Sequence, residues 1–535
     1  MNLVLKNREL CDLELLLNGG FAPLTGYLSQ ADYKSVLDNL HLSTGELWPM
    51  PIVLKISSKQ QEEIKQKGIT NITLTDSTNL PLANLNINSI YKPDLQKECN
   101  SVFNSCDTNH PYIAEILQNP DVWYVGGPVT QINPPLHYDF SNIRLTPKET
   151  RQYFRKKRWS TVVGFQTRNP MHRSHYELTK YALRCTGDSD AKLFLNPVVG
   201  VTQACDVDYH TRVKCYKILV EKYYPQGQVL LNLLPLSMRM AGPREALWHA
   251  LIRQNYGCTH FVVGRDHAGP SYKKADGSSF FGPFDAHDLL HKYRHEMSIK
   301  VIKSQFIVYV KQLDKYLPMD QVPKGMEVLN ISGTQQRKML KNGEEIPSWF
   351  SYPEVVSQLR KSFKQSQGVC FYFTGLSGSG KSTLANCLIQ MLKERYSRTV
   401  TLLDGDVVRQ HLSKGLGFNR TDRSTNVRRI GYVASEIVKH DGIVVCANIA
   451  PYDADRLENR KLISQHGKYI EIFVNTNLSV CEKRDVKGLY ALARKGVIKQ
   501  FTGVSDPFEL PSQADIVING DDPIETNLEI ILKHM

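Results

Sequence analysis

Apolar runs and amphipathic segments alternate along most of the chain, and this alternation predicts strands followed by helices. An unbroken apolar run over 369–373 predicts a buried strand, and the pattern over 383–392 predicts the helix after it. Upstream, similar patterns predict strands over 160–165 and 259–263 and a helix over 174–185. Strands that alternate with helices are typical of a parallel α/β sheet.

The first 140 residues have a different pattern. They contain short β-rich pieces, such as 51–56 and 71–75, which turn residues separate. Pro134 and Pro135 mark one boundary, and a second lies between 345 and 368. Because 535 residues are too many for one core, we expect an α/β multidomain protein. The expected parts are a β-rich domain over 1–140, an α/β domain over 141–350, a linker over 351–365 and a second α/β domain over 366–535.

The composition is that of a globular protein, with 41% hydrophobic and 22% charged residues. No apolar run approaches the roughly 18 residues that a membrane-spanning helix needs, and charges interrupt the start of the chain where a signal peptide has its apolar core. The 11 cysteines are scattered without a C-x-x-C pair, which argues against a disulfide framework and a cysteine-based zinc site. We therefore expect a cytoplasmic protein with no membrane partner and no zinc.

A net charge of +13 suits anionic partners, either nucleic acid or nucleotides, sulfate and pyrophosphate. The densest basic run, 151–158, follows Thr146 and Pro147, and we interpret it as a solvated helix face. No RNP, zinc-finger or helix-turn-helix signature accompanies it, so we expect no nucleic-acid partner.

The segment from Gly375 to Ser382 fits the phosphate-binding pattern G-x-x-x-x-G-K-[ST] at every defined position. A loop between a strand and a helix directs backbone N–H groups at a polyphosphate. In this arrangement Lys381 reaches the β- and γ-phosphates and Ser382 ligates Mg²⁺. The residues predicted to bind ATP here are Gly375, Ser377, Gly378, Ser379, Gly380, Lys381, Ser382 and Thr383.

A predicted strand over 399–403 follows, and it ends at Asp404 and Asp406. A carboxylate at that position holds Mg²⁺ or accepts a proton from an attacking hydroxyl. Next comes a stretch dense in arginine with one aromatic residue, which suits a nucleotide that carries extra negative charge. Its members are Arg409, Phe418, Asn419, Arg423, Asn426, Arg428 and Arg429.

Two polar segments follow predicted strands in the central part, where ligands bind in an open α/β sheet. The first runs from Gln166 to His175 and contains a His-x-x-His pair, His172 and His175. This pair either ligates a metal, although no third ligand is evident, or donates hydrogen bonds to the phosphates of a nucleotide as charge develops. The second segment runs from Gly264 to Pro270, and its arginine and backbone amides suit a tetrahedral oxyanion.

Residues 1 to about 350 resemble ATP sulfurylase, through the segments 17–26, 124–128, 166–175, 238–245 and 264–270. The resemblance implies a PUA-like N-terminal domain and a Rossmann-like nucleotidyltransferase domain with a small closing region. It implies that Gln166, Arg168 and the backbone near Ala268 bind sulfate. It also implies that Thr167, Asn169, His172 and His175 contact ATP phosphates and that Arg265 assists. One family segment is altered over 196–206, where Gln203 replaces a basic residue, and this puts the rate or affinity of that half in doubt.

Residues 366–535 resemble adenylylsulfate kinase, through the phosphate loop and the segments 404–409, 416–418, 422–426, 449–452, 484–490 and 506–508. The resemblance implies a P-loop kinase domain in which Asp404 or Asp406 is the base or the metal-holding group. Arg409, Phe418, Arg423 and Asn426 are implied to hold adenylylsulfate, and Lys487 and Arg494 to lie on a lid over the ATP phosphates.

The two resemblances together imply a bifunctional, Mg²⁺-dependent enzyme that is expected to be a homo-oligomer. It would join sulfate to ATP, release pyrophosphate, and then phosphorylate adenylylsulfate at its 3′-hydroxyl. One alternative is a sulfurylase whose C-terminal domain binds 3′-phosphoadenylylsulfate only as a regulator. A second alternative, from another class, is a basic nucleic-acid binder.

Overall fold

The computed structural model describes residues 1–203, 206–361, 368–396, 399–534 and no others of the chain. It divides into two compact units, Met1–Arg360 and Lys361–Met535. Ala204 and Cys205 of the altered segment, and the part of the expected linker after Lys361, lie outside the described residues. Each unit is described by itself below.

A seven-stranded sheet forms the N-terminal part of the first unit, in the order β1-β4-β5-β7-β2, and β3 and β6 also pair with the long strand β7. Its strands are β1 (Asn2–Val4), β2 (Gly26–Tyr27), β3 (Leu54–Ile56), β4 (Asn71–Thr75), β5 (Pro81–Asn86), β6 (Ser89–Tyr91) and β7 (Trp123–Gln131). The helices of this part are α1 (Asn7–Leu17), α2 (Gln30–Asn39), α3 (Ser58–Lys67), α4 (Leu95–Phe103) and α5 (Pro111–Leu117).

The central part is built on a five-stranded parallel sheet in the order β10-β9-β8-β11-β12. The strands are β8 (Val162–Phe165), β9 (Lys192–Leu195), β10 (Val229–Leu231), β11 (His260–Val263) and β12 (Lys300–Lys303). The helices are α6 (Pro147–Lys156), α7 (Arg173–Cys185), α8 (Tyr209–Lys222), α9 (Pro243–Tyr256) and α10 (Asp285–Lys292). The parallel sheet and the strands and helix predicted here are confirmed, with ends that differ by one or two residues.

The basic run lies on α6 and on the turn after it. Thr146 caps this helix, Pro147 is its first residue, and Glu149 bonds back to the backbone N–H of Thr146 at 2.7 Å. Phe154 is buried on one side, and the basic side chains are exposed. The predicted solvated helix face is therefore confirmed.

The N-terminal part and the central part share one hydrophobic core. The ring of Phe21 lies 5.7 Å from the ring of Trp48 and 5.1 Å from that of Trp248, which is on α9. All three side chains are fully buried. Because aromatic rings of this size dominate the packing energy of a core, we infer that the N-terminal sheet supports α9.

A small antiparallel sheet and two helices complete the first unit. The sheet has the order β14-β13-β15, with β13 (Ile307–Val310), β14 (Lys315–Pro318) and β15 (Val328–Leu329). The helices are α11 (Gly333–Asn342) and α12 (Pro353–Lys361). The expected linker over 351–365 needs a correction, because Val355 and Leu359 of α12 are buried in the core with strand β9. The apolar spacing along α12 requires this burial, so the chain is folded up to Lys361.

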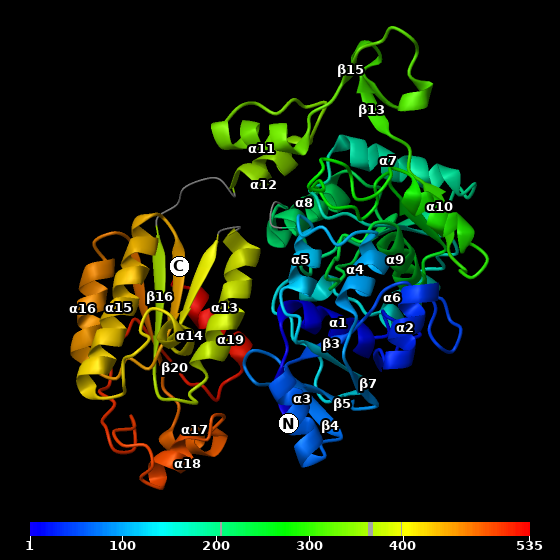
Figure 1. Ribbon diagram of the computed structural model, residues 1–535. Coiled ribbons are helices and arrows are strands. Elements are labelled where there is room, and N and C mark those ends of the chain that lie inside the picture. Colours follow the sequence, from blue (N-terminus) through cyan, green and yellow to red (C-terminus); the bar gives the residue numbers. More distant parts are fainter. Residues whose placement is uncertain (204–205, 362–367, 397–398, 535) are drawn as a thin grey trace. The chain divides into compact units, whose positions relative to one another are not determined.

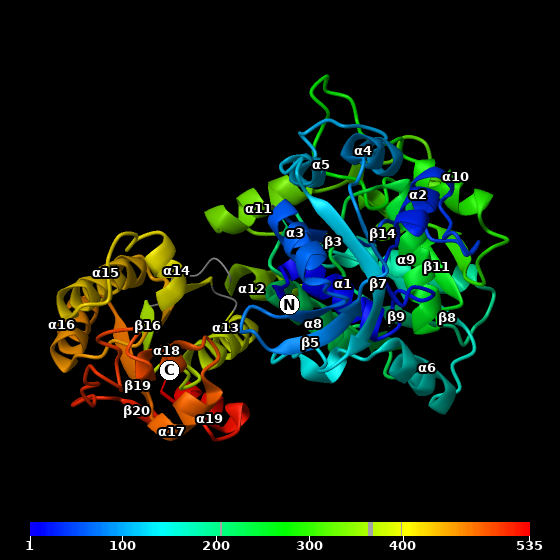
Figure 2. The same ribbon diagram turned by 60° about the horizontal axis from the view of Figure 1, so that its bottom comes forward.

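The second unit is a five-stranded parallel sheet in the order β17-β18-β16-β19-β20. Its strands are β16 (Val369–Thr374), β17 (Val400–Asp404), β18 (Ile443–Ala447), β19 (Lys468–Val474) and β20 (Ile516–Ile518). Its helices are α13 (Lys381–Tyr396), α14 (Gly405–Gln410), α15 (Arg420–Lys439), α16 (Asp453–Ile463), α17 (Leu478–Arg484), α18 (Leu489–Arg494) and α19 (Ile524–Leu532). Helices α15 and α16 cover one face of the sheet, and α13 and α19 cover the other (Figures 1 and 2). Strand β16 is buried along its whole length, as its apolar run predicted.

Within the described ranges, every helix is too short or too polar to cross a bilayer.

Candidate active sites

Three loops of the first unit leave the same edge of the central sheet. Strands β8, β9 and β11 are parallel, so their carboxyl ends meet at one edge. The segment from Gln166 follows β8, the segment from Asn196 follows β9, and the segment from Gly264 follows β11. The two polar segments predicted from the sequence therefore leave one edge, where an open α/β sheet binds its ligands.

Arg168 reaches across this edge to the loop after β9. Its Nη1 donates to Oδ2 of Asp206 at 3.1 Å, and that carboxylate also accepts from the backbone N–H of Gln203 at 3.1 Å. Beside it, the hydroxyl of Thr167 donates to the carbonyl of Asn169 at 2.9 Å. The buried Oε1 of Gln166 has no hydrogen-bond partner among the described residues. The segment thus offers a guanidinium and a free amide oxygen at the strand end.

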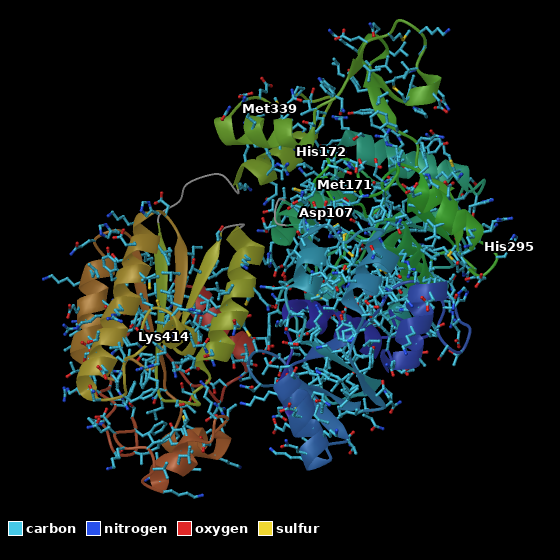
Figure 3. The ribbon with its side chains drawn as sticks, in the orientation of Figure 1. Asp107, Met171, His172, His295, Met339 and Lys414 are labelled. Carbon is cyan, nitrogen blue, oxygen red and sulfur yellow. The ribbon has the colours of Figure 1, made fainter. Side chains whose placement is uncertain are left out.

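His172 and His175 lie together at the start of α7, as predicted. His172 is the N-terminal capping residue, and its backbone N–H donates to Nδ1 of His175 at 3.3 Å. The Nδ1 of His172 lies 2.9 Å from the hydroxyl of Ser351, and the centre of its ring lies 4.6 Å from that of Phe350 in a tilted arrangement. Figure 3 shows His172 and Met171 in this region. The segment just before α12 therefore holds the first histidine in place.

Both histidines are neutral in the absence of a ligand. Burial and the neighbouring His175 lower the pKa of His172 to about 3, and burial lowers the pKa of His175 to about 4. Neutral imidazoles donate one hydrogen bond each without carrying a buried charge. Within the described residues, no group of three or more His, Cys, Asp or Glu side chains is arranged to hold a metal ion.

The loop after β11 has a strained backbone. Asp266 and Ala268 adopt positive φ angles of 53° and 56° although neither is glycine. The carbonyl of Ala268 accepts from the backbone N–H of Gly242 at 3.1 Å. Arg265 is exposed, and its Nε lies 3.3 Å from the carboxylate of Asp266. The guanidinium of Arg265 also lies 6.0 Å from the centre of the Phe306 ring, and both side chains are exposed.

The phosphate loop of the second unit joins β16 to α13 in the predicted way. Gly375, Gly378 and Gly380 have positive φ angles, and a Cβ atom on Gly375 would lie 2.7 Å from the carbonyl oxygen of Val474. Lys381 is nearly buried, and its Nζ donates to the carbonyl of Leu376 at 2.6 Å. Burial lowers the pKa of Lys381 to about 8.

A hydroxyl and two carboxylates lie where the phosphate loop meets the end of β17. The hydroxyl of Ser382 donates to Oδ2 of Asp404 at 2.9 Å. Asp406 forms an ion pair with Lys487 instead. The two carboxylates that the sequence could not separate therefore have different partners. Asp404 faces the loop, and Asp406 faces the segment between α17 and α18.

The arginine-rich stretch supplies a platform near these carboxylates. The guanidinium of Arg409 stacks over the ring of Phe418 at 4.3 Å, and that ring is 60% exposed. Arg423 donates to the carbonyl of Phe418 at 2.7 Å and pairs with Asp506 at 3.1 Å. Asn426 is buried, and its Oδ1 has no partner within the described ranges. An exposed aromatic ring backed by a cation suits a stacked base.

Arg428 and Arg429 of this stretch have other partners. Arg428 pairs with Asp455 at 3.0 Å, and Arg429 donates to the carbonyl of Leu412 at 3.0 Å. Arg494, expected on a lid over the phosphates, forms an ion pair with Glu482. Among the described residues, these contacts hold Arg428 and Arg429 within their own part of the second unit and Arg494 against α17.

The sequence did not point to several contacts that shape the two sites. Ser351 and Phe350 hold His172 from 178 or more positions away along the chain. Arg484 donates to the carbonyl of Gly378 at 3.3 Å, and Tyr490 donates to that of Ser377 at 2.9 Å. Such pairings depend on how distant segments fold back, and no local motif encodes them.

Comparisons with known proteins identify the domains of the chain. A family model described as a PUA-like domain matches residues 1–134, one described as ATP-sulfurylase matches 141–362, and one described as adenylylsulphate kinase matches 367–519. The chain is 47% identical to a sulfate adenylyltransferase of Yarrowia lipolytica over 521 residues, which are 97% of this chain and 90% of the relative. A sulfate adenylyltransferase of Neurospora crassa is 46% identical over 520 residues, with the same shares covered.

Among solved structures, the chain is similar to one titled a hexameric APS kinase from Thiobacillus denitrificans. The two are 30% identical, with a TM-score of 0.56, over 99% of this chain and 92% of the other. The predicted fold class is confirmed, with a PUA-like N-terminal domain, an ATP-sulfurylase domain and a C-terminal P-loop kinase domain. The chain belongs to the sulfate adenylyltransferase family and is a bifunctional enzyme with an ATP-sulfurylase domain and an adenylylsulphate kinase domain.

Proposed function

We propose that the chain activates sulfate in two steps. In the first, an oxygen of sulfate attacks the α-phosphorus of ATP, the bond to the bridging oxygen breaks, and pyrophosphate leaves. In the second, the 3′-hydroxyl of the resulting adenylylsulfate attacks the γ-phosphorus of another ATP and loses its proton, and ADP leaves. One observation carries the proposal. The first unit gathers anion-binding groups at one sheet edge, while the second has a complete phosphate loop next to Asp404.

For the first step, we assign sulfate to Arg168, Gln166 and the backbone at Ala268. Thr167, Asn169, His172 and His175 would bind the ATP phosphates, and Arg265 would assist. The neutral, buried state of the two histidines supports this assignment. Donors that are fixed before the reaction stabilise the charge that develops on pyrophosphate without reorganisation.

For the second step, the different partners of the two carboxylates support different roles. Asp404, next to Ser382, would hold the metal ion, and Asp406 would accept the proton of the 3′-hydroxyl. Lys381 and the loop amides would bind the phosphates of ATP, with Lys487 above them. Arg409, Phe418, Arg423 and Asn426 would hold adenylylsulfate. The exposed Phe418 ring supports this last assignment, and so does the Oδ1 of Asn426, which has no hydrogen-bond partner among the described residues.

Mg²⁺ is the ion that nucleotide-using enzymes of these families generally require with ATP. The hydroxyl of Ser382 and the carboxylate of Asp404 lie 2.9 Å apart and are the hard oxygen donors that Mg²⁺ prefers. When bound there, the ion would offset the negative charge of the β- and γ-phosphates.

The energetics of the two steps give a reason for joining them in one chain. The phosphosulfate bond of adenylylsulfate is high in energy, so the first step runs uphill. The second step consumes its product. The regulatory alternative for the C-terminal domain is less well supported, because this domain matches the adenylylsulphate kinase family model and keeps a complete phosphate loop.

We further propose a homo-oligomer in the cytoplasm. The similarity to a structure titled hexameric supports the first point, and scattered single cysteines, typical of a reducing compartment, support the second. We keep 1–140, 141–350 and 366–535 as the proposed domains, with α12 packed against the second of them.

One experiment tests the proposed function. The full chain is incubated with MgATP and sulfate, and the nucleotide products are separated and identified. We expect pyrophosphate, ADP and 3′-phosphoadenylylsulfate. Adenylylsulfate as the only sulfated product would favour the regulatory alternative. No sulfated nucleotide, together with salt-sensitive binding of random DNA, would favour the nucleic-acid binder.

A further inference from the structure

Two histidines meet at the strained loop after β11: His267 lies on the loop and is half-buried, and His249 lies on α9 and is fully buried. The Nδ1 of His249, on α9, lies 3.1 Å from Nε2 of His267. The Nδ1 of His267 accepts from the backbone N–H of Gly264 at 3.4 Å. On its other side, Nε2 of His249 faces Oε1 of Glu245 at 3.3 Å. His249 and Glu245 are fully buried, so this line of groups runs through the core and ends at the loop.

The contacts fix which nitrogen of each ring carries the proton. Because Gly264 donates to Nδ1 of His267, the proton of a neutral His267 is on Nε2 and is donated to His249. The Nδ1 of His249 is then the acceptor, and its Nε2–H lies 3.3 Å from Oε1 of Glu245, close enough for an electrostatic contact but without the alignment of a hydrogen bond. Burial, with His249 and Arg253 nearby, holds the pKa of His267 well below its usual range, and burial also lowers the pKa of His249. Each histidine thus has a polar neighbour on either side.

Glu245 also reaches the other end of the same loop. Its Oε1 accepts from the backbone N–H of Arg239 at 3.0 Å, and its Oε2 accepts from that of Ala241 at 2.8 Å. The next residue, Gly242, donates its backbone N–H to the carbonyl of Ala268 at 3.1 Å. One buried carboxylate therefore holds both ends of the segment 264–268, through the histidines at Gly264 and through the 239–242 backbone at Ala268.

The network continues into the N-terminal part of the first unit. Arg239, itself buried, pairs with Asp12 of α1 at 2.5 Å. The carboxylate of Glu245 thus acts on a segment that α1 also anchors. This arrangement gives the N-terminal domain a physical connection to the sheet edge of the first unit.

The segment 264–268 needs such support. Asp266 and Ala268 adopt left-handed backbone conformations that residues other than glycine avoid. A conformation of this kind persists only where the surrounding structure imposes it. Arg265 and Ala268 on this segment are the groups assigned above to the anionic substrates.

We propose that Glu245 and His249 are positioning residues for the sulfurylase reaction, which act through His267 and the 239–242 backbone to hold the segment 264–268 in its active shape. The inference rests on the proposed function of the first unit. Neither side chain touches a substrate in this proposal. They act on sulfate binding and the reaction step, and not on the ATP contacts made by the 166–175 segment.

Variants of His249 in the full chain test the proposal. His249→Leu removes both hydrogen-bonding atoms, and we expect kcat/KM for sulfate to fall by about 10²-fold, the scale for a misplaced reactive group. His249→Asn places an acceptor near the position of Nδ1, and we expect it to recover most of the loss. The KM for MgATP in the sulfurylase assay should not change in either variant. Adenylylsulfate kinase activity of the same molecules is the internal control for global damage.

Each other outcome counts against the proposal. An unchanged kcat/KM for sulfate in His249→Leu would overturn it, and so would equal losses in the Leu and Asn variants. A joint rise of both KM values would indicate general loosening instead of positioning. If His249→Leu does not fold, His249→Asn is compared with His249→Gln, which keeps only the donor toward Glu245. Sulfurylase activity of His249→Gln that equals or exceeds that of His249→Asn would overturn the proposal. Failure of the wild-type chain to make adenylylsulfate would instead refute the proposed function, and this inference with it.

Discussion

Arg168 and Asp206 form an ion pair at 3.1 Å, so the arginine assigned to sulfate already holds a carboxylate. Both side chains are mostly shielded from solvent, and the pair is therefore screened less than one at the surface. Sulfate that approaches Arg168 meets the negative charge of Asp206. The two anions compete for one guanidinium unless the loop after β9 moves.

Asp206→Asn tests this competition. The variant keeps an oxygen that can accept from the backbone N–H of Gln203 but removes the charge. We expect the KM for sulfate to fall by about fivefold, which corresponds to about 1 kcal/mol of repulsion between nearby charges. Asp190→Asn, which removes an exposed carboxylate before β9, is the matched control. A rise in KM for sulfate would mean that Asp206 positions Arg168 and does not compete with the substrate.

His172→Ala and His175→Ala should each lower sulfurylase activity by about 10²-fold, the scale for loss of a preorganised donor to the transition state. Arg168→Ala should have an effect of similar size. Pyrophosphate release from MgATP and sulfate is the measurement, and kinase activity with added adenylylsulfate should persist. Unchanged pyrophosphate release in all three variants would show that the cluster is structural.

The same two histidines should make the first unit sensitive to acid. Burial lowers their pKa to about 3 and about 4 in the folded chain, whereas an unfolded histidine titrates near pH ~6.5. Between these values the unfolded chain binds more protons, so the free energy of unfolding decreases as the pH falls from about 6.5 to about 4. Above that range the two histidines contribute no pH dependence.

His175→Gln should therefore flatten the decline of the unfolding midpoint between pH 6 and pH 4. The exposed His295, replaced in the same way, is the control and should leave the decline as it is in the wild type (Figure 3). Identical pH profiles for His175→Gln and the wild type would show that His175 is not held neutral by burial.

The sequence was sufficient to predict a candidate site where its residues all lie within one short segment. The phosphate loop, the capping histidines of α7 and the carboxylates after β17 were all predicted from local patterns, because a strand end, a turn and a helix start determine them together. It was insufficient where partners are far apart. Three such pairings depend on tertiary packing: Asp406 with Lys487, Arg168 with Asp206, and Glu245 with both ends of a distant loop. The expected linker over 351–365 was corrected for a related reason, because the core that buries Val355 and Leu359 forms only when the unit is folded.

Lys381→Ala should abolish the second step and spare the first. The variant removes the charge proposed to contact the β- and γ-phosphates, and we expect phosphorylation of adenylylsulfate to fall by about 10²-fold or more. Lys414→Ala removes an exposed lysine from the same unit and is the matched control (Figure 3). Kinase activity within a few fold of the wild type in Lys381→Ala would mean that the loop is not catalytic.

A fragment that starts near Ser366 should fold and phosphorylate added adenylylsulfate with MgATP. Among the described residues, its five parallel strands pair with one another, and helices of the same unit cover both faces of the sheet (Figures 1 and 2). At about 170 residues it has the size of an ordinary independent domain. The complementary fragment that ends near Arg360 should keep sulfurylase activity.

The same kinase fragment with Lys381→Ala is the control for phosphoryl transfer. A fragment that is folded by circular dichroism and binds 3′-phosphoadenylylsulfate, yet turns over no adenylylsulfate, would refute the bifunctional mechanism. The C-terminal domain would then be a product sensor, because binding without transfer is what a regulatory site requires.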